Sequence, residues 1–563
     1  MDHRPWHSSY APGVPVSIEY EKITVPNTLR RSAGRFPHNT ALNYMGRRIS
    51  FARLESMVNG FCRALEGLGV RPGDRVAMCL PNIPQAIVTN MAVMRMGAVT
   101  VPVNPLYTER ELAYQLCDAE TKAMVTLALL LPRVKKIQDK IPVKSVVACH
   151  IQEYLPFPKK QLFPFVKKAM TAKVTPEKDV YVFSELLARQ DTSPYQDKSN
   201  WEDLGALLYT GGTTGVSKGV MLHHRNLSSN VQQFASWFPD LEPGTQRVVG
   251  NYPVFHSAGF TAIQNFCLGY GHEFILVPRP EPSVIIEIIK KYKPTFLPGV
   301  PTIFVSLLND PRFRKLDLSS IRGFFAGAAP LPAEVVRDLQ SLTGGFICDV
   351  YGSTETAPIA TVTPWGGKVK QGTVGIPVPD TIVKIVDLED PTKEMPAGQA
   401  GEVAVRGPQI MAGYYKKPEE TAKVLKDGWF YSGDIGVMDE DGYLSIVDRK
   451  KDMIIAGGYN IYPVEIDGIL FSHPKVLEAC TVGVPDTYRG ETVKAFVALK
   501  PGETATEEEI IAFCKKNLAA YKVPKKVEFV PELPKTTVGK ILRRKLRDAE
   551  MEKAKKAETG PSA

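Results

Sequence analysis

Hydrophobic and polar residues alternate along residues 24–200 with two different periods. In RISFARLESMVNGFCRALEGLGV (48–70) the apolar positions recur every three to four residues, which predicts a helix with one buried face. DRVAMCL (74–80) follows as a short apolar run typical of a buried strand. Helical segments that alternate with buried strands predict an α/β domain.

The same alternation resumes in the middle of the chain. FLPGVPTIF (296–304), IRGFFAGAAPL (321–331) and FICDVYGSTE (346–355) each run from an apolar strand into a turn that contains glycine. Ligands of open α/β sheets bind at the carboxyl ends of such strands, so we expect these turns to face one crevice.

The pattern then shortens twice. Short strands such as TIVKIVDLE (381–389) and GYLSIVDR (442–449) predict a small β-barrel-like subdomain over 371–447. After residue 452, two strand-like segments, a helix from 506 to about 519 and KKVEFVPELPKT (525–536) predict a compact α+β unit. The predicted fold class is therefore α/β, with a large N-terminal body of two α/β subdomains and a β-barrel-like subdomain, and a small mobile α+β C-terminal cap.

Composition and charge narrow the function classes. The 563 residues exceed what one hydrophobic core accommodates, and 44% hydrophobic with 23% charged residues is typical of globular domains. Eight scattered cysteines without C-x-x-C spacing indicate neither a disulfide framework nor a zinc site, which favours a reducing cytoplasm. We expect neither a secretory signal nor a spanning helix, because the longest apolar run, 123–131, is far below the ~20 residues needed. The net charge of +9 lies mainly after residue 158 and near the end, which favours anionic ligands or lipid head groups over nucleic acid.

The segment YTGGTTGVSKG (209–219) combines conformational freedom with hydrogen-bond donors. Its glycines allow several N–H groups to turn toward one oxyanion, its hydroxyls add donors, and Lys218 adds charge. Lys218 follows Ser217 and precedes Gly219, which departs from the P-loop of kinases and GTPases. The segment therefore predicts a polyphosphate-binding loop, and a polar surface hairpin is the structural alternative.

Seven motifs carry a resemblance over roughly residues 25–548. In chain order they are YTGGTTGVSKGVMLHHRNL, YPVFHSAGF, AGAAPLP, YGSTETAP, GWFYSGDIG, DRKKDMIIAGGYNIYPVEID and PKTTVGKILRRKL. This order resembles the acyl-adenylate-forming superfamily of acyl-CoA synthetases, luciferases and peptide-synthetase adenylation domains. Two departures, Ser217 in place of a usual proline and PVEID in place of a more common P-x-E-[IV]-E, remove no catalytic group.

The resemblance implies ATP, Mg²⁺ and CoA as ligands and gives individual residues their roles. Lys540, Glu355 and Thr354 are implied to be catalytic, with Glu355 the Mg²⁺ ligand and Thr354 at the α-phosphate. The implied ATP-binding residues are Thr210, Gly211, Gly212, Thr213, Thr214, Gly215, Lys218, Gly327, Ala328, Tyr351, Gly352, Asp434 and Arg449. The implied acyl-binding residues are His256, Phe260 and Ala329, and Gly457 and Gly458 are implied to line the CoA channel.

The resemblance also implies the domain bounds. The body spans 1–448, a hinge around Lys451 spans 449–452, the cap spans 453–548, and a charged tail spans 549–563. Without the motifs, the same residues have structural interpretations: Glu355 and Lys540 as solvated surface groups, Asp434 as a turn cap, and His256 as a core histidine.

The substrate class follows from the closest resemblance, which is to bacterial medium- to long-chain fatty acid CoA ligases. It implies acyl-AMP formation with release of pyrophosphate, followed by acyl transfer to CoA with release of AMP. Four alternatives stay open: a CoA ligase for an aryl or alicyclic acid, an acyl-AMP ligase for another thiol acceptor, a luciferase-like monooxygenase, and an inactive lipid-binding protein. The sequence does not indicate an oligomeric state.

Residues 156–173 interleave aromatic and aliphatic side chains with five lysines. Lysines near anionic lipid contribute about 1 kcal/mol each, so the segment predicts peripheral contact with the inner face of the membrane. Prolines 156, 158 and 164 preclude one continuous helix and favour a loop that leads into a short helix. A basic loop packed on the body is the alternative.

Overall fold

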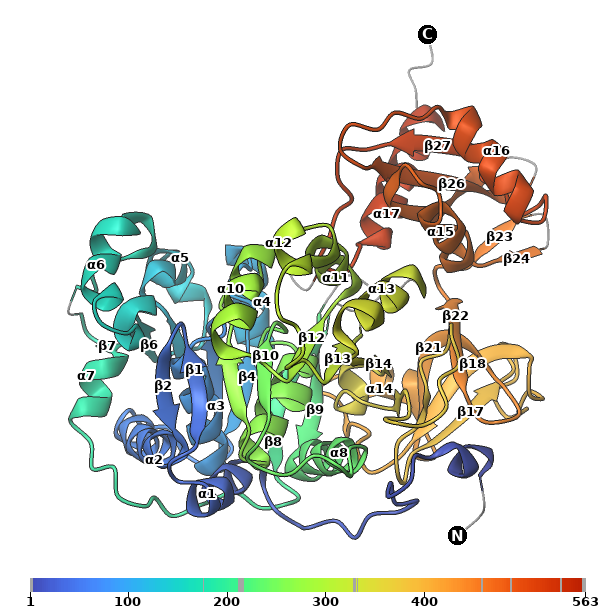
Figure 1. Ribbon diagram of the computed structural model, residues 1–563. Helices are drawn as coiled ribbons and strands as arrows, with labels where there is room; N and C mark the ends of the chain where they lie inside the picture. The colour runs from blue at the N-terminus through green and yellow to red at the C-terminus, as the bar shows by residue number, and fades with distance from the viewer. Residues whose placement is uncertain are drawn as a thin grey trace. The chain divides into compact units, whose positions relative to one another are not determined.

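The computed structural model describes residues 4–175, 177–210, 217–327, 331, 333–456, 459–486, 489–536 and 539–558. Figure 1 shows the chain from its N-terminal helices to the C-terminal helix α17 (Arg543–Glu558). Packing divides the chain into two units: Met1–Ile382 with Val405–Phe430, and Val383–Ala404 with Tyr431–Ala563.

The first unit contains an eight-stranded sheet in the order β19-β9-β8-β4-β3-β5-β6-β7. Its strands are β3 (Arg75–Cys79), β4 (Val99–Pro102), β5 (Thr121–Leu127), β6 (Ser145–Cys149), β7 (Val180–Val182), β8 (Leu204–Thr210), β9 (Lys218–His223) and β19 (Gly413–Tyr414). The strands from β8 to β7 run parallel, while β9 pairs antiparallel with both β8 and β19.

The second sheet of this unit has nine strands in the order β16-β15-β14-β13-β12-β10-β11-β1-β2. They are β1 (Thr40–Tyr44), β2 (Arg47–Ser50), β10 (Arg247–Gly250), β11 (Glu273–Leu276), β12 (Phe296–Gly299), β13 (Gly323–Ala326), β14 (Phe346–Tyr351), β15 (Thr361–Val362) and β16 (Ile376–Pro377). The strands from β14 to β1 are parallel, and the outer ones are antiparallel. These two sheets confirm the two predicted α/β subdomains.

Helices connect the strands, and most of them contribute buried side chains to the core. They are α1 (Val25–Arg35), α2 (Phe51–Gly67), α3 (Pro84–Arg95), α4 (Glu109–Asp118), α5 (Leu131–Lys136), α6 (Lys159–Val166), α7 (Phe183–Ala188), α8 (His224–Ser236), α9 (Phe266–Gly269), α10 (Pro282–Tyr292), α11 (Pro301–Leu308), α12 (Pro311–Arg314), α13 (Ala333–Thr343) and α14 (Pro418–Val424). The predicted helix within 48–70 is α2, which begins where Ser50 Oγ accepts from the Arg53 N–H at 3.2 Å. Every residue of α3 is buried, so this helix forms a central part of the core.

The second unit contains two smaller sheets. One joins β17 (Ile382–Val386), β18 (Ala400–Arg406) and β21 (Trp429–Met438), and β21 pairs with β22 (Leu444–Arg449). The first two residues of β21, Trp429 and Phe430, belong to the first unit and pair there with β20 (Leu425–Lys426). The other joins β23 (Ile454–Ala456), β24 (Tyr459–Ile461), β25 (Val476–Asp486), β26 (Gly490–Leu499) and β27 (Lys526–Phe529). Helices α15 (Pro463–Phe471), α16 (Glu507–Asn517) and α17 accompany this sheet, which confirms the α+β character predicted for the cap.

The packing units do not coincide with the predicted domain bounds. The sheet of β17, β18, β21 and β22 packs with the cap rather than with the body, and α17 extends into the predicted tail at 549–563. Packing does not locate a hinge, so the bounds 1–448, 449–452, 453–548 and 549–563 stay predictions.

Two further observations concern chemistry. Among the residues that the structure describes, no helix combines the length and the apolar character that crossing a bilayer requires. All eight cysteines are free thiols, and Cys117 is the exposed one.

Candidate active site

The glycine-rich segment lies between two paired strands of the first unit. Thr210, the last residue of β8, is in register with Lys218, the first residue of β9, and Ser217 Oγ donates to the Thr210 carbonyl at 2.7 Å. Residues 211–216 lie outside the described residues, so the phosphate contacts predicted for Gly211, Gly212, Thr213, Thr214 and Gly215 stay predictions. The segment is therefore a hairpin connection whose two ends are held together.

Tyr209 packs against Gly219 at the base of this hairpin. A Cβ at Gly219 would lie 3.0 to 3.2 Å from the ring and hydroxyl atoms of Tyr209, so glycine lets the tyrosine ring cross the pairing strand. The Tyr209 hydroxyl donates to Asp118 Oδ2 at 2.7 Å, and Tyr114 donates to the Ser217 carbonyl at 2.9 Å. These contacts hold the two strand ends from which the glycine-rich loop extends.

Lys218 points into the protein and not into solvent. Its side chain is 11% exposed, its Nζ lies 2.6 Å from Glu420 Oε2, and the same nitrogen stands 4.9 Å from the centre of the Tyr414 ring. The hydrogen bond from Lys218 holds the pKa of Glu420 well below its usual range. A phosphate that binds Lys218 would have to share the ammonium group with Glu420 or displace it.

Glu355 belongs to a 3₁₀ turn, Thr354–Thr356, that follows β14. It is buried, and its Oε1 accepts a hydrogen bond of 2.8 Å from the Tyr414 hydroxyl. Thr354 Oγ1 donates to Ser257 Oγ at 3.3 Å, which brings the YGSTE and FHSAGF motifs into contact. The structure therefore joins Lys218, Tyr414 and Glu355 in one continuous group of contacts.

The donor set around Glu355 fits a magnesium ion that ATP brings with it. Within the described residues, Tyr414 is the group that donates to this carboxylate, and no cluster of three or more His, Cys, Asp and Glu side chains is suited to a metal. Mg²⁺ is commonly held by one or two carboxylates together with substrate phosphates rather than by a cage of protein ligands. A single buried carboxylate with one oxygen held by tyrosine meets that requirement.

Gly327, Tyr351 and Gly352 lie at the carboxyl ends of the adjacent parallel strands β13 and β14, as predicted. Gly352 has a structural reason to be glycine, since a Cβ would lie 1.9 Å from the Pro358 carbonyl oxygen. Its backbone is nevertheless exposed, so an adenine could also approach it. Ala328 and Ala329 lie outside the described residues, and their predicted contacts are not tested.

The FHSAGF motif leads into an unusual helix. Residues Ala258–Asn265 form a π-helix, a rare form that is frequent at functional sites. The Ala258 N–H donates to His256 Nδ1 at 3.3 Å, so His256 caps the turn that precedes this helix. The Phe260 side chain is completely buried, as expected for a wall residue and equally for a core residue. The predicted acyl contacts of both residues stay predictions.

In the second unit, the two residues predicted to hold ribose are directly opposite each other. Asp434 on β21 is in register with Arg449 at the end of β22, and Arg449 Nε lies 3.0 Å from Asp434 Oδ1. Asp434 is buried and Arg449 is half exposed. The pair presents an oriented, acceptor-only carboxylate of the kind that binds two vicinal hydroxyls.

Lys540 and Lys451 both lie in environments that disfavour their charge. Desolvation, followed by the positive charge of Arg449, lowers the pKa of Lys540 to about 8 and that of Lys451 to about 8. The negative charges of Asp434 and Asp452 oppose this effect on the pKa of Lys540. Gly457 and Gly458 lie outside the described residues, so the predicted CoA channel is not tested.

Helix α17 contacts the predicted hinge through Arg547, and it contacts Asp448, the residue directly before the hinge, through Arg543. Arg543 pairs with Asp448 at 3.3 Å and with Asp467, and Arg547 Nη1 donates to the Lys451 carbonyl at 2.6 Å. Desolvation raises the pKa of Asp448 to about 6. The segment that carries Lys540 is thus tied to the hinge by the helix that follows it.

Sequence reasoning missed several residues of this site. Tyr414 and Glu420, in GYYKKPEET, contact Glu355 and Lys218 from far along the chain. Asn82 is buried and holds the loop before FHSAGF, since its amide donates to the carbonyls of residues 250 and 252. Proline and glutamate at 418–419 are a local sign that a helix begins there. No spacing rule in the sequence, however, connects Tyr414 or Glu420 to the glycine-rich loop.

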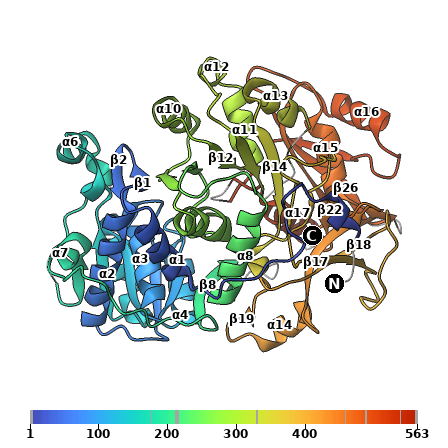
Figure 2. The same cartoon turned by 60° about the horizontal axis from the view of Figure 1, so that its bottom comes forward.

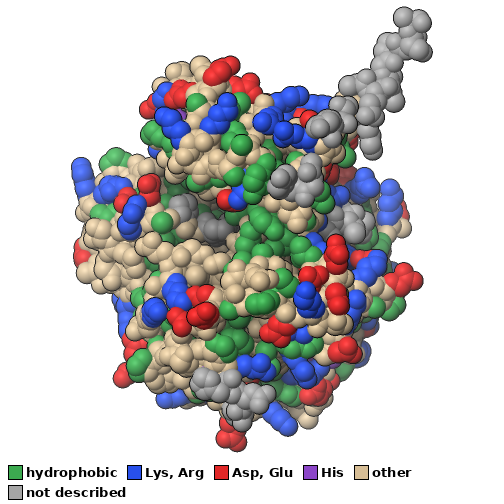
Figure 3. Space-filling view, turned by 90° about the vertical axis from the view of Figure 1, so that its right-hand side faces the viewer, with side chains coloured by type: hydrophobic (Ala, Val, Ile, Leu, Met, Phe, Trp, Pro, Cys, Tyr) green, Lys and Arg blue, Asp and Glu red, His purple; other side chains and the backbone are tan. Residues whose placement is uncertain are grey.

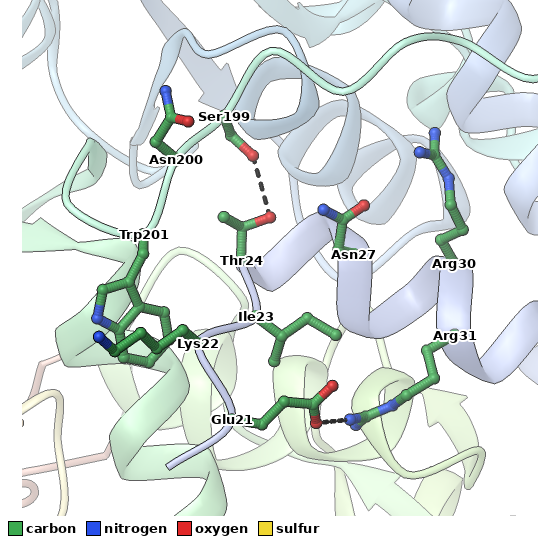
Figure 4. A pocket seen from close by; sticks show the side chains of 10 residues that line it. All are labelled: Glu21, Lys22, Ile23, Thr24, Asn27, Arg30, Arg31, Ser199, Asn200 and Trp201. Carbon is green, nitrogen blue, oxygen red and sulfur yellow. Dashed lines mark hydrogen bonds and ion pairs between the residues drawn. The ribbon is translucent and has the colours of Figure 1, made fainter.

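An open depression of about 570 Å³ lies elsewhere in the first unit, at the start of α1 (Figure 4). In it Ser199 Oγ donates to Thr24 Oγ1 at 3.0 Å, and Arg31 pairs with Glu21. None of the predicted site residues lines this depression, and Arg30 is paired with Glu55. It therefore adds nothing to the candidate site.

Two family descriptions match the chain. Residues 29–415 match the AMP-binding enzyme family, and residues 465–540 match the AMP-binding enzyme C-terminal domain. The long-chain-fatty-acid–CoA ligase of Bacillus subtilis is 43% identical over 98% of this chain and 99% of its own length. A long-chain-fatty-acid–CoA ligase of Salmonella typhi is 39% identical over 96% of this chain and 98% of its own length.

Solved structures give the same result for the fold. The anthranilate CoA ligase AuaEII, in complex with anthranoyl-AMP, matches with a TM-score of 0.84 and 28% identity over 95% of this chain and 98% of that chain. ATP-bound MatB from Rhodopseudomonas palustris matches with a TM-score of 0.82 and 31% identity over 94% of this chain and 99% of that chain.

Proposed function

Because this chain belongs to the AMP-binding enzyme family, we propose that it is an ATP-dependent acyl-CoA synthetase for medium- to long-chain fatty acids. The fatty acid carboxylate attacks the α-phosphorus of ATP to form acyl-AMP and pyrophosphate. The CoA thiol then displaces AMP to form the acyl thioester. The observation that carries this proposal is identity of 43% with a long-chain ligase along practically the entire chain.

The first step joins two negatively charged reactants, so catalysis depends on positioning and on charge neutralisation. Thr210, Lys218 and the loop between them bind the β- and γ-phosphates, and Thr354 contacts the α-phosphate. Glu355 would hold the Mg²⁺ that accompanies ATP, and the Tyr414 hydroxyl orients its carboxylate through a hydrogen bond of 2.8 Å. When bound there, the metal would supply charge stabilisation to the phosphate oxygens.

The sugar and the base of ATP are held by separate residues. Asp434 accepts from the ribose hydroxyls while Arg449, 3.0 Å away, holds the carboxylate in position. Tyr351 packs against adenine. The small residues Gly327, Ala328 and Gly352 allow the nucleotide to approach the protein backbone closely.

The cap acts in both half-reactions. Lys540 neutralises the carboxylate during adenylation, and after rotation about Lys451 the segment with Gly457 and Gly458 lines the pantetheine channel. The acyl chain lies against His256, Phe260 and Ala329, where each buried methylene contributes about 0.8 kcal/mol. An apolar tunnel of this kind favours long acids without a specific polar contact.

A CoA ligase for an aryl or alicyclic acid is the second candidate, since the anthranilate CoA ligase shares the fold at a TM-score of 0.84. An acyl-AMP ligase for another thiol is the third. We place the enzyme in the cytoplasm, with peripheral contact to the membrane through residues 156–173.

A panel of acids tests the substrate class. Values of kcat/KM for palmitate, decanoate, benzoate and cyclohexanecarboxylate in a CoA-dependent AMP-release assay should rank the aliphatic acids first. Preference for benzoate would instead support the second candidate. Pyrophosphate release without AMP release on addition of CoA would support a different acceptor, and no pyrophosphate release with any acid would indicate an inactive lipid-binding protein.

Two substitutions separate the half-reactions. Lys540→Ala should slow acyl-adenylate formation by on the order of 10²- to 10³-fold and leave thioester formation from supplied acyl-adenylate nearly intact. Gly458→Leu should do the reverse. Parallel losses in both single-turnover assays for either folded variant would contradict the alternating cap.

The magnesium assignment has its own test. Glu355→Gln keeps the size of the side chain and removes the charge that attracts a hard cation. The concentration of Mg²⁺ needed for half-maximal adenylation should rise, and an unchanged requirement in a folded variant excludes Glu355 as a ligand.

A further inference from the structure

Residues 156–173 present apolar side chains directly to solvent. Phe157 and Phe165 are each 82% exposed, and Leu162, Val166 and Met170 are also exposed. The described part of the chain has fourteen exposed large hydrophobic side chains, and these five are more than a third of that set. All five lie between residues 157 and 170. Folded proteins seldom gather such side chains on their surface without an interaction partner.

The segment is held at both ends. Leu155 is buried on one side, and Ala172 and Val174 pack against the buried side chains of Ala128 and Ala148 on the other. Between these anchors lie the eight residues of α6, which include Pro164, and the 3₁₀ turn Lys168–Met170. The prediction of a loop that leads into a short helix is confirmed, and Pro164 lies inside that helix. The exposed side chains are thus presented on an anchored element.

The charge of this segment has one sign. Lys159, Lys160, Lys167, Lys168 and Lys173 are all exposed, and no acidic residue occurs between Glu153 and Glu177. Among the described residues, no carboxylate lies within ion-pair distance of these lysines. The face shown in Figure 3 differs, because it carries Lys and Arg interspersed with Asp and Glu.

A second element extends this surface. The turn between β1 and β2 lies beside α6 in both views (Figures 1 and 2), where Lys159 Nζ donates to the Met45 carbonyl at 3.4 Å. Met45, Arg47 and Arg48 are exposed on this turn and add one apolar and two cationic side chains. We refer to Met45, Arg47, Arg48 and residues 156–173 together as the basic apolar surface.

We propose that the basic apolar surface docks on the surface of an anionic lipid bilayer. Lysines and arginines bind the lipid phosphates while the exposed aromatic and aliphatic side chains enter the boundary between head groups and acyl chains. A protein partner fits less well, because lysine is depleted from the cores of protein interfaces, whereas here lysines separate the apolar residues. The short α6 allows shallow contact with the interface and not insertion across it.

This docking has a consequence for catalysis that rests on the proposed function. Long-chain fatty acids partition into bilayers, so docking would deliver the enzyme to its substrate and leave soluble short acids unaffected. The docking itself needs no turnover, so a failure of the proposed function and a failure of docking are distinguished by separate measurements.

Sedimentation with vesicles tests the proposal. The probes are phosphatidylcholine vesicles alone and phosphatidylcholine vesicles with an equal amount of phosphatidylglycerol. The full chain should bind the anionic vesicles much more strongly, and added salt should release it. A variant with K160Q, K167Q, K168Q and K173Q should lose on the order of 10²- to 10³-fold in partition coefficient at low salt, about fivefold for each lysine.

A matched variant controls for total charge. K515Q, K516Q, K525Q and K526Q remove the same number of exposed lysines from the cap and should leave most of the binding intact. A third variant, F157S with F165S, keeps every charge and should also reduce binding, and both side chains are too exposed for the change to disturb the core.

Three results would overturn the proposal. They are equal binding to both vesicle types, equal losses in the two lysine variants, and concentration-dependent self-association that F157S with F165S abolishes. The last result would identify the surface as an interface between two copies of the chain.

Discussion

Tyr414 links the candidate metal ligand to the lysine of the glycine-rich hairpin, and Tyr414→Phe separates its two contacts. The hydroxyl donates to Glu355 Oε1 at 2.8 Å, while the ring lies 4.9 Å from Lys218 Nζ. Phenylalanine keeps the ring and its contact with the ammonium group and removes the donor. Glu355 is buried, so solvent does not readily replace the lost hydrogen bond.

The expected magnitude follows from the charge and the burial of the acceptor. A hydrogen bond to a charged group contributes about 1.5 to 3 kcal/mol, so Tyr414→Phe should lower the free energy of unfolding by about that amount. Residues that orient a metal ligand typically change metal affinity by about 10- to 100-fold when removed. If Glu355 holds Mg²⁺, the Mg²⁺ requirement of adenylation should rise by a similar factor.

The assays are urea unfolding followed by tryptophan fluorescence and acid-dependent exchange between ATP and pyrophosphate at a series of Mg²⁺ concentrations. Tyr415→Phe is the control, because the neighbouring hydroxyl makes an exposed hydrogen bond of 3.3 Å to Glu120. It should change stability by less than about 0.5 kcal/mol and leave the Mg²⁺ requirement unchanged. If the two variants behave alike in both assays, Tyr414 does not position Glu355.

Three other predictions use the same physical reasoning. The pKa of Lys540 is lowered to about 8, so kcat/KM for adenylation should fall as pH rises through about 8, and Lys540→Arg should remove this alkaline decline if the lysine charge causes it. Gly352→Ala places a Cβ 1.9 Å from the Pro358 carbonyl oxygen and should lower the free energy of unfolding by about 1 to 3 kcal/mol or more. Gly34→Ala, in α1 with no atom within 4 Å of the new Cβ, should not destabilise the protein. Thermal melts compare the two variants. Burial raises the pKa of Asp349 from 3.8 to about 7, so the stability contributed by its protonated form is complete below about pH 4 and lost as pH rises through about 7. The urea midpoint of Asp349→Asn should therefore rise relative to that of the unsubstituted protein between these pH values. A difference that does not change with pH would contradict the raised pKa of Asp349.

Much of the fold was predictable because helices and strands differ in the period of their apolar positions. The helix in 48–70 and the strands at 296–299, 323–326 and 346–351 follow that rule, and their register places Gly327 and Tyr351 at adjacent strand ends. The π-helix at 258–265 was not predictable, since the period of apolar positions does not separate i to i+5 bonding from an ordinary helix.

The candidate site was predictable where a motif lies on one element and was not where distant elements meet. The Asp434 and Arg449 motifs occur close together in sequence, and the two residues face each other in the structure. Glu420 is more than two hundred residues from Lys218 in the sequence. The pairing of β19, which carries Tyr414, with β9, which carries Lys218, brings Tyr414 beside Lys218. Contacts of this kind depend on sheet order, which periodicity does not specify.

The position of Arg449 has a kinetic consequence. This residue pairs with Asp434, and the next residue, Lys450, donates its N–H to the Gly433 carbonyl at 2.9 Å. If the sugar is held by Asp434 and Arg449 and the cap rotates about Lys451 as we propose, the bound nucleotide contacts Arg449, the first residue of the predicted hinge. The time that the cap spends in each orientation would then depend on which nucleotide is bound. Release of pyrophosphate would set the moment at which the cap rotates. AMP, still held by its ribose, would leave after the thioester has formed.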